Sequence, residues 1–137
     1  MRELSREISV AQSLVPGALV AASVSGSTVD LQGYEGATFV IDVGLWTDGT
    51  HTFVLQESAT DVDGSFTAIA DADLVGTEPV VDGAADDNQI YKIGYTGTLR
   101  YVRVRSVVSG GPQTGAYYSA TVIQSRPRHQ PTGSTQV

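Results

Sequence analysis

The sequence predicts an all-β fold, a single-domain β-sandwich with an extended arm at each end. Apolar residues recur with a period of two along most of the 137-residue chain, and no stretch has the period of an amphipathic helix. Turn-forming residues separate the apolar runs at roughly every 8 to 12 positions, which is typical of sandwiches. A jelly roll and an immunoglobulin-like sandwich both place alternating strands in two packed sheets, so the pattern leaves the strand order open.

The clearest pair of strands lies in the first half of the domain, after a strand expected over 18–25. Along 37–46 the alternation places four apolar residues on one inward face, and it turns Trp46 outward. A turn around Gly49, which can take a positive φ, predicts a hairpin into a strand over 51–58. The four inward residues are Phe39, Ile41, Val43 and Leu45.

A second hairpin is predicted from residue 57, through a turn at 61–64, into a strand ending at residue 70. Its register is open, because either Phe66 and Ala68 or Thr67 and Ile69 can face inward. Further strands, separated by Gly, Asp, Asn or Pro, are predicted over 78–81, 89–95, 99–108 and 116–124.

The two ends differ from the middle. Residues 1–15 alternate only weakly and form the predicted N-terminal arm, with apolar anchors. Residues 126–137, rich in Pro and polar residues and carrying Arg126 and Arg128, form the predicted C-terminal arm, which leaves 16–125 as the sandwich domain. The anchors of the N-terminal arm are Leu4, Ile8, Val10, Leu14 and Val15.

Charge is divided along the chain. Of the 15 acidic residues all but Glu3 and Glu7, thirteen in number, lie in 30–87, where there is no Lys or Arg. Of the eight basic residues all but Arg2 and Arg6, six in number, lie in 92–137, where there is no acidic residue. Such division favours electrostatic attraction between copies or neighbours, and so indicates assembly. The net charge of −7 argues against nucleic acid as a partner, because binding to phosphates depends on Lys and Arg.

The absence of cysteine excludes disulfides, thiolate metal sites and thiol nucleophiles. The fairly apolar run 8–24 is interrupted by Gln12, Ser13, Pro16 and Gly17. A membrane span needs about 20 mostly apolar residues, so we expect neither a membrane segment nor a secretory signal. The expectation is a soluble protein made in a cytoplasm.

No catalytic or metal site is predicted. The acidic turns 61–64, 71–73 and 82–88 resemble fragments of a calcium loop but lack its full set of oxygen ligands, so we interpret them as turns. His51 and His129 are the only histidines, which leaves no pair for zinc, and no nucleophile motif accompanies His51. We therefore expect no enzymatic activity, no metal and no cofactor.

The strand over 99–108 carries the candidate interaction residues. Its alternation turns Val102 and Val104 inward, and it turns Tyr101, Arg103 and Arg105 outward. Tyr and Arg are enriched at protein contacts, so this stripe is either an interface or a solvated face that pairs with Asp residues of the same molecule. Trp46 either joins such an interface or caps the edge of the core.

Two segments resemble a family of small virion proteins of tailed phages and prophages, typically encoded beside the major capsid protein. These segments are DLQGYEGATFVIDVGLWTDGTHTFVLQES at 30–58 and VGTEPVVDGAADDNQIYKIGYTGTLRYVRV at 75–104, and the similarity covers most of residues 8–129. They are strings of strands and turns rather than catalytic motifs. The resemblance therefore bears on the family more than on a particular role.

The resemblance implies a structural virion protein on the capsid exterior, made in a bacterial host. Its expected role is that of a capsid cement or decoration protein, which binds the outside of a phage head and staples neighbouring subunits of the major capsid protein. A homo-oligomer, dimer or trimer, is expected there, with both arms lying on the capsid or on a sister subunit. The alternative is a head-completion, neck or tail-tube protein. A carbohydrate-binding module would want a row of exposed aromatic residues, and one Trp and three Phe supply few.

Overall fold

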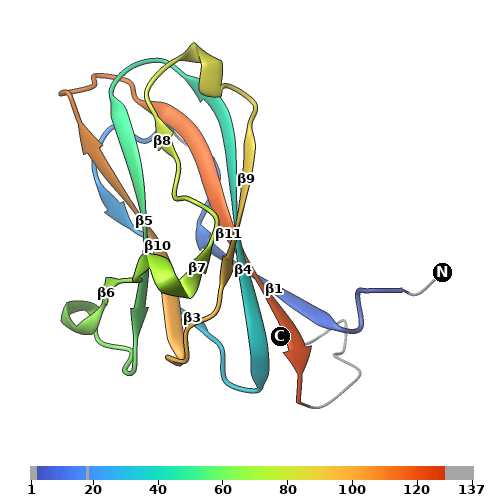
Figure 1. Cartoon of the computed structure of the whole chain (residues 1–137). Helices are drawn as coiled ribbons and strands as arrows, with labels where there is room; N and C mark the ends of the chain where they lie inside the picture. The colour runs from blue at the N-terminus through green and yellow to red at the C-terminus, as the bar shows by residue number, and fades with distance from the viewer. Residues whose placement is uncertain (1–2, 18, 129–137) are drawn as a thin grey trace.

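The computed structural model describes residues 3–17 and 19–128, which form two antiparallel sheets packed face to face (Figure 1). One sheet has five strands in the order β1-β11-β4-β9-β7, and the other is built on the order β2-β10-β5-β6, with β3 beside β10 and β8 beside β5. The strands are β1 (Ile8–Leu14), β2 (Val24–Ser25), β3 (Val29–Asp30), β4 (Tyr34–Trp46), β5 (Thr50–Ser58), β6 (Thr67–Ala68), β7 (Leu74–Val75), β8 (Val80–Val81), β9 (Ile90–Tyr95), β10 (Tyr101–Ser109) and β11 (Ala116–Pro127). Three single-turn 3-10 helices lie in the connections: η1 (Asp63–Ser65), η2 (Asp71–Asp73) and η3 (Ala84–Asp86).

The strand pairing is that of a jelly roll. The first half of the chain runs antiparallel to the second: β1 pairs with β11, β2 and β3 with β10, β4 with β9, and β5 with β6 and β8. An immunoglobulin-like sandwich instead pairs its first two strands with each other in one sheet. Here β1 and β2 lie in different sheets, which resolves the choice that the sequence left open.

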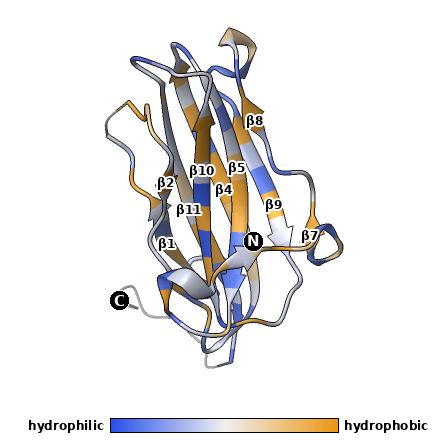
Figure 2. Cartoon of the chain, turned by 90° about the vertical axis from the view of Figure 1, so that its left-hand side faces the viewer, coloured by the Kyte–Doolittle hydropathy of each residue, from blue (hydrophilic) through white to orange (hydrophobic). Residues whose placement is uncertain are grey.

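The core fills the space between the sheets with the residues that the alternation turns inward. Phe39, Ile41 and Val43 of β4 face Phe53 and Leu55 of β5, and all five are buried. Val102 and Val104 of β10 are fully buried, as the alternation predicts, and Figure 2 shows apolar and polar residues alternating along this strand. With no disulfide available, stability has to come from this packing and from the hydrogen bonds of the sheets.

The predicted hairpin over 37–46 and 51–58 is wrong in one respect. Both strands form, and Gly49 takes a φ of 85° in the turn between them, but they do not pair with each other. β4 pairs with β9 and β11, whereas β5 crosses to the other sheet and pairs with β10. A short turn between two strands of alternating sequence fits a connection between the two sheets as well as a hairpin within one sheet. Which of the two forms is decided by the other strands with which each strand pairs.

The inward face of β4 ends earlier than its alternation predicts. Leu45 is exposed, and Trp46 packs against the core instead. The cause is a bulge: Ala116 pairs with Trp46 and Tyr118 pairs with Val43, so β4 has one residue more than β11 over this stretch. An extra residue reverses the faces of the strand beyond it.

The second hairpin forms, since β6 pairs with β5 beyond η1. Neither predicted register is correct, because Phe66 and Ile69 are the buried residues, with Thr67 and Ala68 exposed between them. The alternation fails because β6 is only two residues long. The strand expected over 18–25 is likewise reduced to β2, with a single bridge between Val20 and Ala116 upstream of it.

About half of the predicted N-terminal arm, 1–15, is part of the sandwich. Ile8–Leu14 is the edge strand β1, and it pairs along its length with β11 (Figure 1). At the other end β11 continues to Pro127, so Arg126 also belongs to a strand rather than to a separate arm. Residues 1–2 and 129–137, which are the outer ends of the predicted arms and include His129, lie outside the described residues.

Candidate functional site

The candidate interaction residues do not form one site. Tyr101, Arg103 and Arg105 lie on the outer face of the β10 sheet, whereas Ile8 and Val10 lie on the outer face of the other sheet. Trp46 lies at the turn that joins β4 to β5, and Arg126 and Arg128 lie at the end of β11. The structure therefore has several separate surfaces that have to be judged one by one.

Arg103 is not part of an exposed stripe. Its side chain points to the outer face, as the alternation predicts, but it is only 8% exposed, because the connection between β5 and β6 folds over it. Its guanidinium lies 4.2 Å from the centroid of the Phe66 ring and donates hydrogen bonds to Gln56 (2.7 Å) and Asp63 (2.6 Å). The interpretation as a face that pairs with Asp residues of the same molecule therefore holds for Arg103.

Tyr101 and Arg105, on either side of Arg103, are half-buried. The Arg100 guanidinium lies 4.9 Å from the centroid of the Tyr101 ring. Arg105 donates a 2.7 Å hydrogen bond to the hydroxyl oxygen of Ser25 and forms no ion pair within the described residues. Of the predicted stripe, Arg105 is the cation that remains available to a carboxylate of another molecule.

Trp46 has a structural role at the end of the sandwich. Its indole N–H donates a 2.8 Å hydrogen bond to the Gly49 carbonyl, and its backbone N–H donates a 2.7 Å bond to the Asp87 carboxylate. The side chain is half-buried against the core. Trp46 therefore caps the edge of the core, which is the second of the two roles considered for it.

The candidate residues in the two predicted arms differ in exposure and in their contacts with the rest of the chain. Leu4 and Val10 expose 60% and 63% of their surface, whereas Ile8 is half-buried. Arg126 is exposed, at a φ of 52°. The backbone N–H of Arg128 donates a 2.8 Å hydrogen bond to the carbonyl of Gly33. The Arg128 guanidinium lies 3.8 Å from a carboxylate oxygen of Glu35.

The charge division along the chain is partly neutralised inside the molecule. Because the second half of a jelly roll runs beside the first, arginines of the second half come next to acids of the first. The strongest exposed example is Arg100, whose two 2.8 Å contacts to Asp30 hold the pKa of that carboxyl below its ordinary value. The three pairs are Arg100 with Asp30, Arg103 with Asp63, and Arg128 with Glu35.

The charge that remains is distributed unequally over the two long edges of the sandwich. One edge is built by 57–90, which contains β6, β7 and β8 with their 3-10 turns, and it carries nine acidic residues and no basic one. We call it the acidic edge. The opposite edge is built by 8–29, which contains β1 and β2 and has no charged residue at all. We call it the uncharged edge. Sequence reasoning missed this edge, although a run of 22 residues without charge could have indicated it.

Exposed apolar side chains occur on the uncharged edge and on the outer face of the β1 sheet beside it. Val15 is 68% exposed, and Val10 and Val24 are also exposed. A groove of about 500 Å³ runs between the end of β1 and the segment 19–27, and apart from Tyr118 its lining belongs to the uncharged edge. This surface is uncharged and partly apolar, which is a composition typical of protein contacts.

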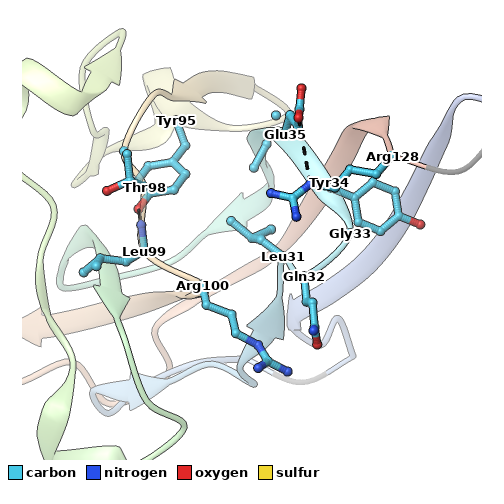
Figure 3. Close-up of a pocket in the computed structure, with 13 residues that line it drawn as sticks. Leu31, Gln32, Gly33, Tyr34, Glu35, Tyr95, Thr98, Leu99, Arg100 and Arg128 are labelled. Atoms are coloured by element: carbon cyan, nitrogen blue, oxygen red, sulfur yellow. Dashed lines mark hydrogen bonds and ion pairs between the residues drawn. The ribbon is translucent and has the colours of Figure 1, made fainter.

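A second pocket, of about 420 Å³, opens between the turn that leads into β4 and the turn between β9 and β10. Figure 3 shows the two turns on either side of it, with the ion pair of Glu35 and Arg128 at its rim. The Tyr95 hydroxyl donates a 2.7 Å hydrogen bond to Glu57, and burial is the main reason that its pKa is raised. Of the charged side chains that line this pocket, Glu35 and Arg128 pair with each other, and Arg100 pairs with Asp30. They do not form a nucleophile with an adjacent base.

The buried His51 also has its ring nitrogens occupied. Nε2 lies 3.0 Å from the Asp48 carbonyl oxygen, to which it has to donate, and Nδ1 lies 3.1 Å from the Tyr118 hydroxyl. That hydroxyl is in turn 3.0 Å from Ser106. Within 3–17 and 19–128 no three His, Cys, Asp or Glu side chains gather closely enough to hold a metal ion.

Comparison with known proteins adds no identification. No protein-family model, no curated protein and no solved structure matches this chain. In the part of the chain that the structure describes, no helix is long and apolar enough to cross a membrane.

Proposed function

We propose that this chain is a capsid cement or decoration protein, which binds the outer surface of a phage head and staples neighbouring subunits of the major capsid protein. The proposal makes it a structural virion protein without enzymatic activity, metal or cofactor. It starts from the resemblance of 30–58 and 75–104 to phage virion proteins, and the jelly-roll sandwich is compatible with it. Because one fold serves many functions, the argument has to come from the surfaces.

The observation that carries the proposal is the distribution of apolar side chains on the surface, together with the pairing of the buried polar side chains. Apolar side chains are exposed at the edges and on the flat faces at Val10, Val75 and Ile90, none of which lines either of the two pockets. The buried polar side chains are all hydrogen-bonded within the described residues, which leaves no unsatisfied group aimed at a substrate. A molecule with several contact surfaces and no reaction site is suited to holding other proteins together.

A capsid lattice suits such a molecule because it repeats the same surface many times. Several modest contacts made by one rigid sandwich to neighbouring subunits combine, since binding at one contact raises the effective concentration at the next. Non-covalent cross-links of this kind would raise the barrier to rupture of a shell under pressure from packaged DNA. The function is then mechanical and needs no catalytic group.

The decisive experiment is to measure the number of copies of this chain in each virion, by quantitative mass spectrometry or cryo-electron microscopy. A cement protein is expected at hundreds of copies in register with the capsid lattice. The alternative, a head-completion, neck or tail protein, is expected at about six to a dozen copies, because it would close a ring at one vertex. Absence from the virion would remove both assignments.

The contacts can then be tested by variants that respect the fold. Arg105 is the suitable position on β10, because Arg105→Glu reverses the charge of a half-buried residue without removing the contacts of the buried Arg103. If Arg105 contacts an acidic neighbour, the reversal should weaken capsid binding and flatten its dependence on salt. Deletions should be restricted to 1–7 and 129–137, since a longer N-terminal deletion removes β1 from the sandwich. Unchanged occupancy after both deletions would exclude the ends as contacts.

A further inference from the structure

We propose that two copies of this chain pack face to face through the outer face of the five-stranded sheet, about a two-fold axis that runs along β4. The occupant of this face is thus a second copy of the same chain. The proposal follows from which residues stand opposite each other across that axis. It goes beyond the proposed virion role and does not depend on it, because a dimer in solution would stand even if the chain were absent from virions.

The outer face of the five-stranded sheet is formed by the side chains that alternate with the core residues. One row of paired residues crosses all five strands, in the order Val10, Ile123, Thr38, Gly94 and Val75. The valines at the two ends of the row are 63% and 65% exposed, and the three residues between them are half-buried. An uncharged row with apolar side chains exposed at both ends is a surface suited to a protein contact.

The outer face of the other sheet is less suited to symmetric packing. The connection between β5 and β6 folds over part of it, where Arg103 bonds to Asp63. Arg105, which forms no ion pair within the described residues, also points to that face. A two-fold contact there would bring an unpaired cation from each copy into the interface. The five-stranded sheet therefore offers the more open and less charged face.

The order of strands decides which parts of the two copies meet. β4 is the middle strand of the five, so a two-fold axis along it lays β9 of each copy over β11 of the other, and β7 over β1. The acidic edge of one copy then lies over the uncharged edge of its partner. This arrangement keeps the two acidic edges apart, which matters because each chain has a net charge of −7.

Along the central row the two copies are complementary in size. Ile123 of one copy lies over Gly94 of the other, where the missing side chain leaves room for it. At the ends of the row Val10 lies over Val75, so the exposed valines cover each other. Thr38 lies at the axis, opposite Thr38 of the second copy. Sheets packed face to face are about 10 Å apart, so side chains from both faces fill the space between them.

Two charged residues on the same face also complement each other across the axis. Asp42 on β4 and Lys92 on β9 are both exposed, and neither forms an ion pair in the part of the chain that the structure describes. They are diagonal neighbours, since Val40 pairs with Lys92 and Asp42 pairs with Ile90. In the dimer the two Asp42 carboxylates approach the axis, and a Lys92 ammonium from each copy lies beside them. Two acids and two bases thus form a neutral cluster, as a self-complementary interface requires.

The first test measures the mass of the full chain in solution by sedimentation and multi-angle light scattering. The expected species is a concentration-dependent dimer of two 14.4 kDa chains. Asp42→Lys and Lys92→Asp each place four like charges at the axis, so each variant alone should raise the dissociation constant by about tenfold or more. An equimolar mixture of the two variants should restore the dimer, because one copy then contributes two bases and the other two acids. Asp61→Lys, at an exposed acid in the β5–β6 connection, is the control and should leave the dimer in place.

Urea unfolding of the single variants checks that they fold, as expected for substitutions at exposed positions. A monomer or a trimer of the unaltered chain would overturn the proposal. A dimer that both variants leave intact would do the same, and so would a mixture of the two folded variants that fails to pair.

The second test checks the position of the axis and uses the absence of cysteine. Thr38→Cys places one thiol of each copy at the axis, so a thiol-specific cross-linker about 10 Å long should join the two chains efficiently. A mixture of Val10→Cys with Val75→Cys should form the mixed product, whereas each of these variants alone should cross-link less. Thr52→Cys, at a half-buried threonine on the outer face of the other sheet, is the background control. Cross-linking of Thr52→Cys as strong as that of Thr38→Cys would contradict packing through the five-stranded sheet.

Discussion

The guanidinium of Arg103 lies 2.6 Å from the carboxylate of Asp63, and the two side chains differ completely in exposure. The Arg103 side chain is 8% exposed and that of Asp63 is 88% exposed. The bond joins β10 to the turn η1, forty residues earlier, and it holds the β5–β6 connection over the outer face of the sheet. An arginine that looks like an interface residue in sequence is therefore a clamp on a loop of its own chain.

Replacing Arg103 and replacing Asp63 should have unequal effects on stability. Arg103→Ala removes the contact with the Phe66 ring and the hydrogen bond to Gln56, and it should lower the free energy of unfolding by about 2–3 kcal/mol. Asp63→Asn removes only an ion pair whose acid is in water, and it should cost about 0–1 kcal/mol. Urea unfolding of both variants makes the comparison. Equal losses would mean that the ion pair, rather than the packing of Arg103, holds the loop.

The buried hydroxyl of Tyr118 should matter more than that of its neighbour. Tyr118→Phe leaves Nδ1 of His51 without its hydrogen bond inside the core, so it should cost about 1–3 kcal/mol of unfolding free energy. Tyr117→Phe, one residue earlier on the exposed face, is the matched control and should change stability by less than about 0.5 kcal/mol. Thermal or urea unfolding distinguishes them. A neutral Tyr118→Phe variant would show that the hydrogen bond to His51 contributes nothing.

Asp48 should contribute to a loss of stability in acid. Backbone N–H groups of Gly115 and Gln113 donate to its carboxylate and hold its pKa below the ordinary value of 3.8. The folded state therefore binds this proton less readily than the unfolded chain. The stabilisation is complete above the unfolded pKa and is lost as the pH falls below about 4 and through the lower folded pKa.

The variant Asp48→Asn should flatten the dependence of stability on pH below about 4, because it removes this titration. Asp61→Asn, at an exposed position in the acidic edge, is the control and should keep the slope of the unaltered chain. Urea unfolding at a series of pH values measures both slopes. If Asp48→Asn retains the full slope, the acid sensitivity comes from other carboxylates.

Gly115 should tolerate no side chain. It has a φ of 90°, and a Cβ there would run into the carbonyl of Val20, which bridges to Ala116. Gly115→Ala should therefore cost about 2–5 kcal/mol of unfolding free energy. Gly83→Ala is the control, because Gly83 is extended and its Cβ would meet nothing, so the change should be neutral or gain up to about 1 kcal/mol. A mild effect of Gly115→Ala would mean that the 19–21 segment can move away.

The alternation of the sequence correctly predicts the inward-facing residues along most of the two long strands β4 and β10. Phe39, Ile41 and Val43 on β4, and Val102 and Val104 on β10, face the core as their spacing requires. In such strands many side chains share the same choice of face, and burying all of them outweighs local irregularities. Short elements lack this averaging, so the faces of β6 and the end of β4 could not be predicted.

The candidate surfaces depend on tertiary structure in a different way. The sequence shows that 8–29 has no charge and that 57–90 is acidic, but these become opposite edges only through the order of strands in the sheets. Arg103 points outward as its position requires, and only the loop that returns over it makes it buried.

The sequence by itself thus determined the class of fold and the inward face of the long strands, because alternation is a local property of the chain. Only the tertiary structure decided which sheet each strand joins, which arginines are free, and where the uncharged edge lies. The physical reason is that backbone hydrogen bonds between strands are nearly independent of side-chain identity, so the choice among pairings is made by the packing of the whole molecule.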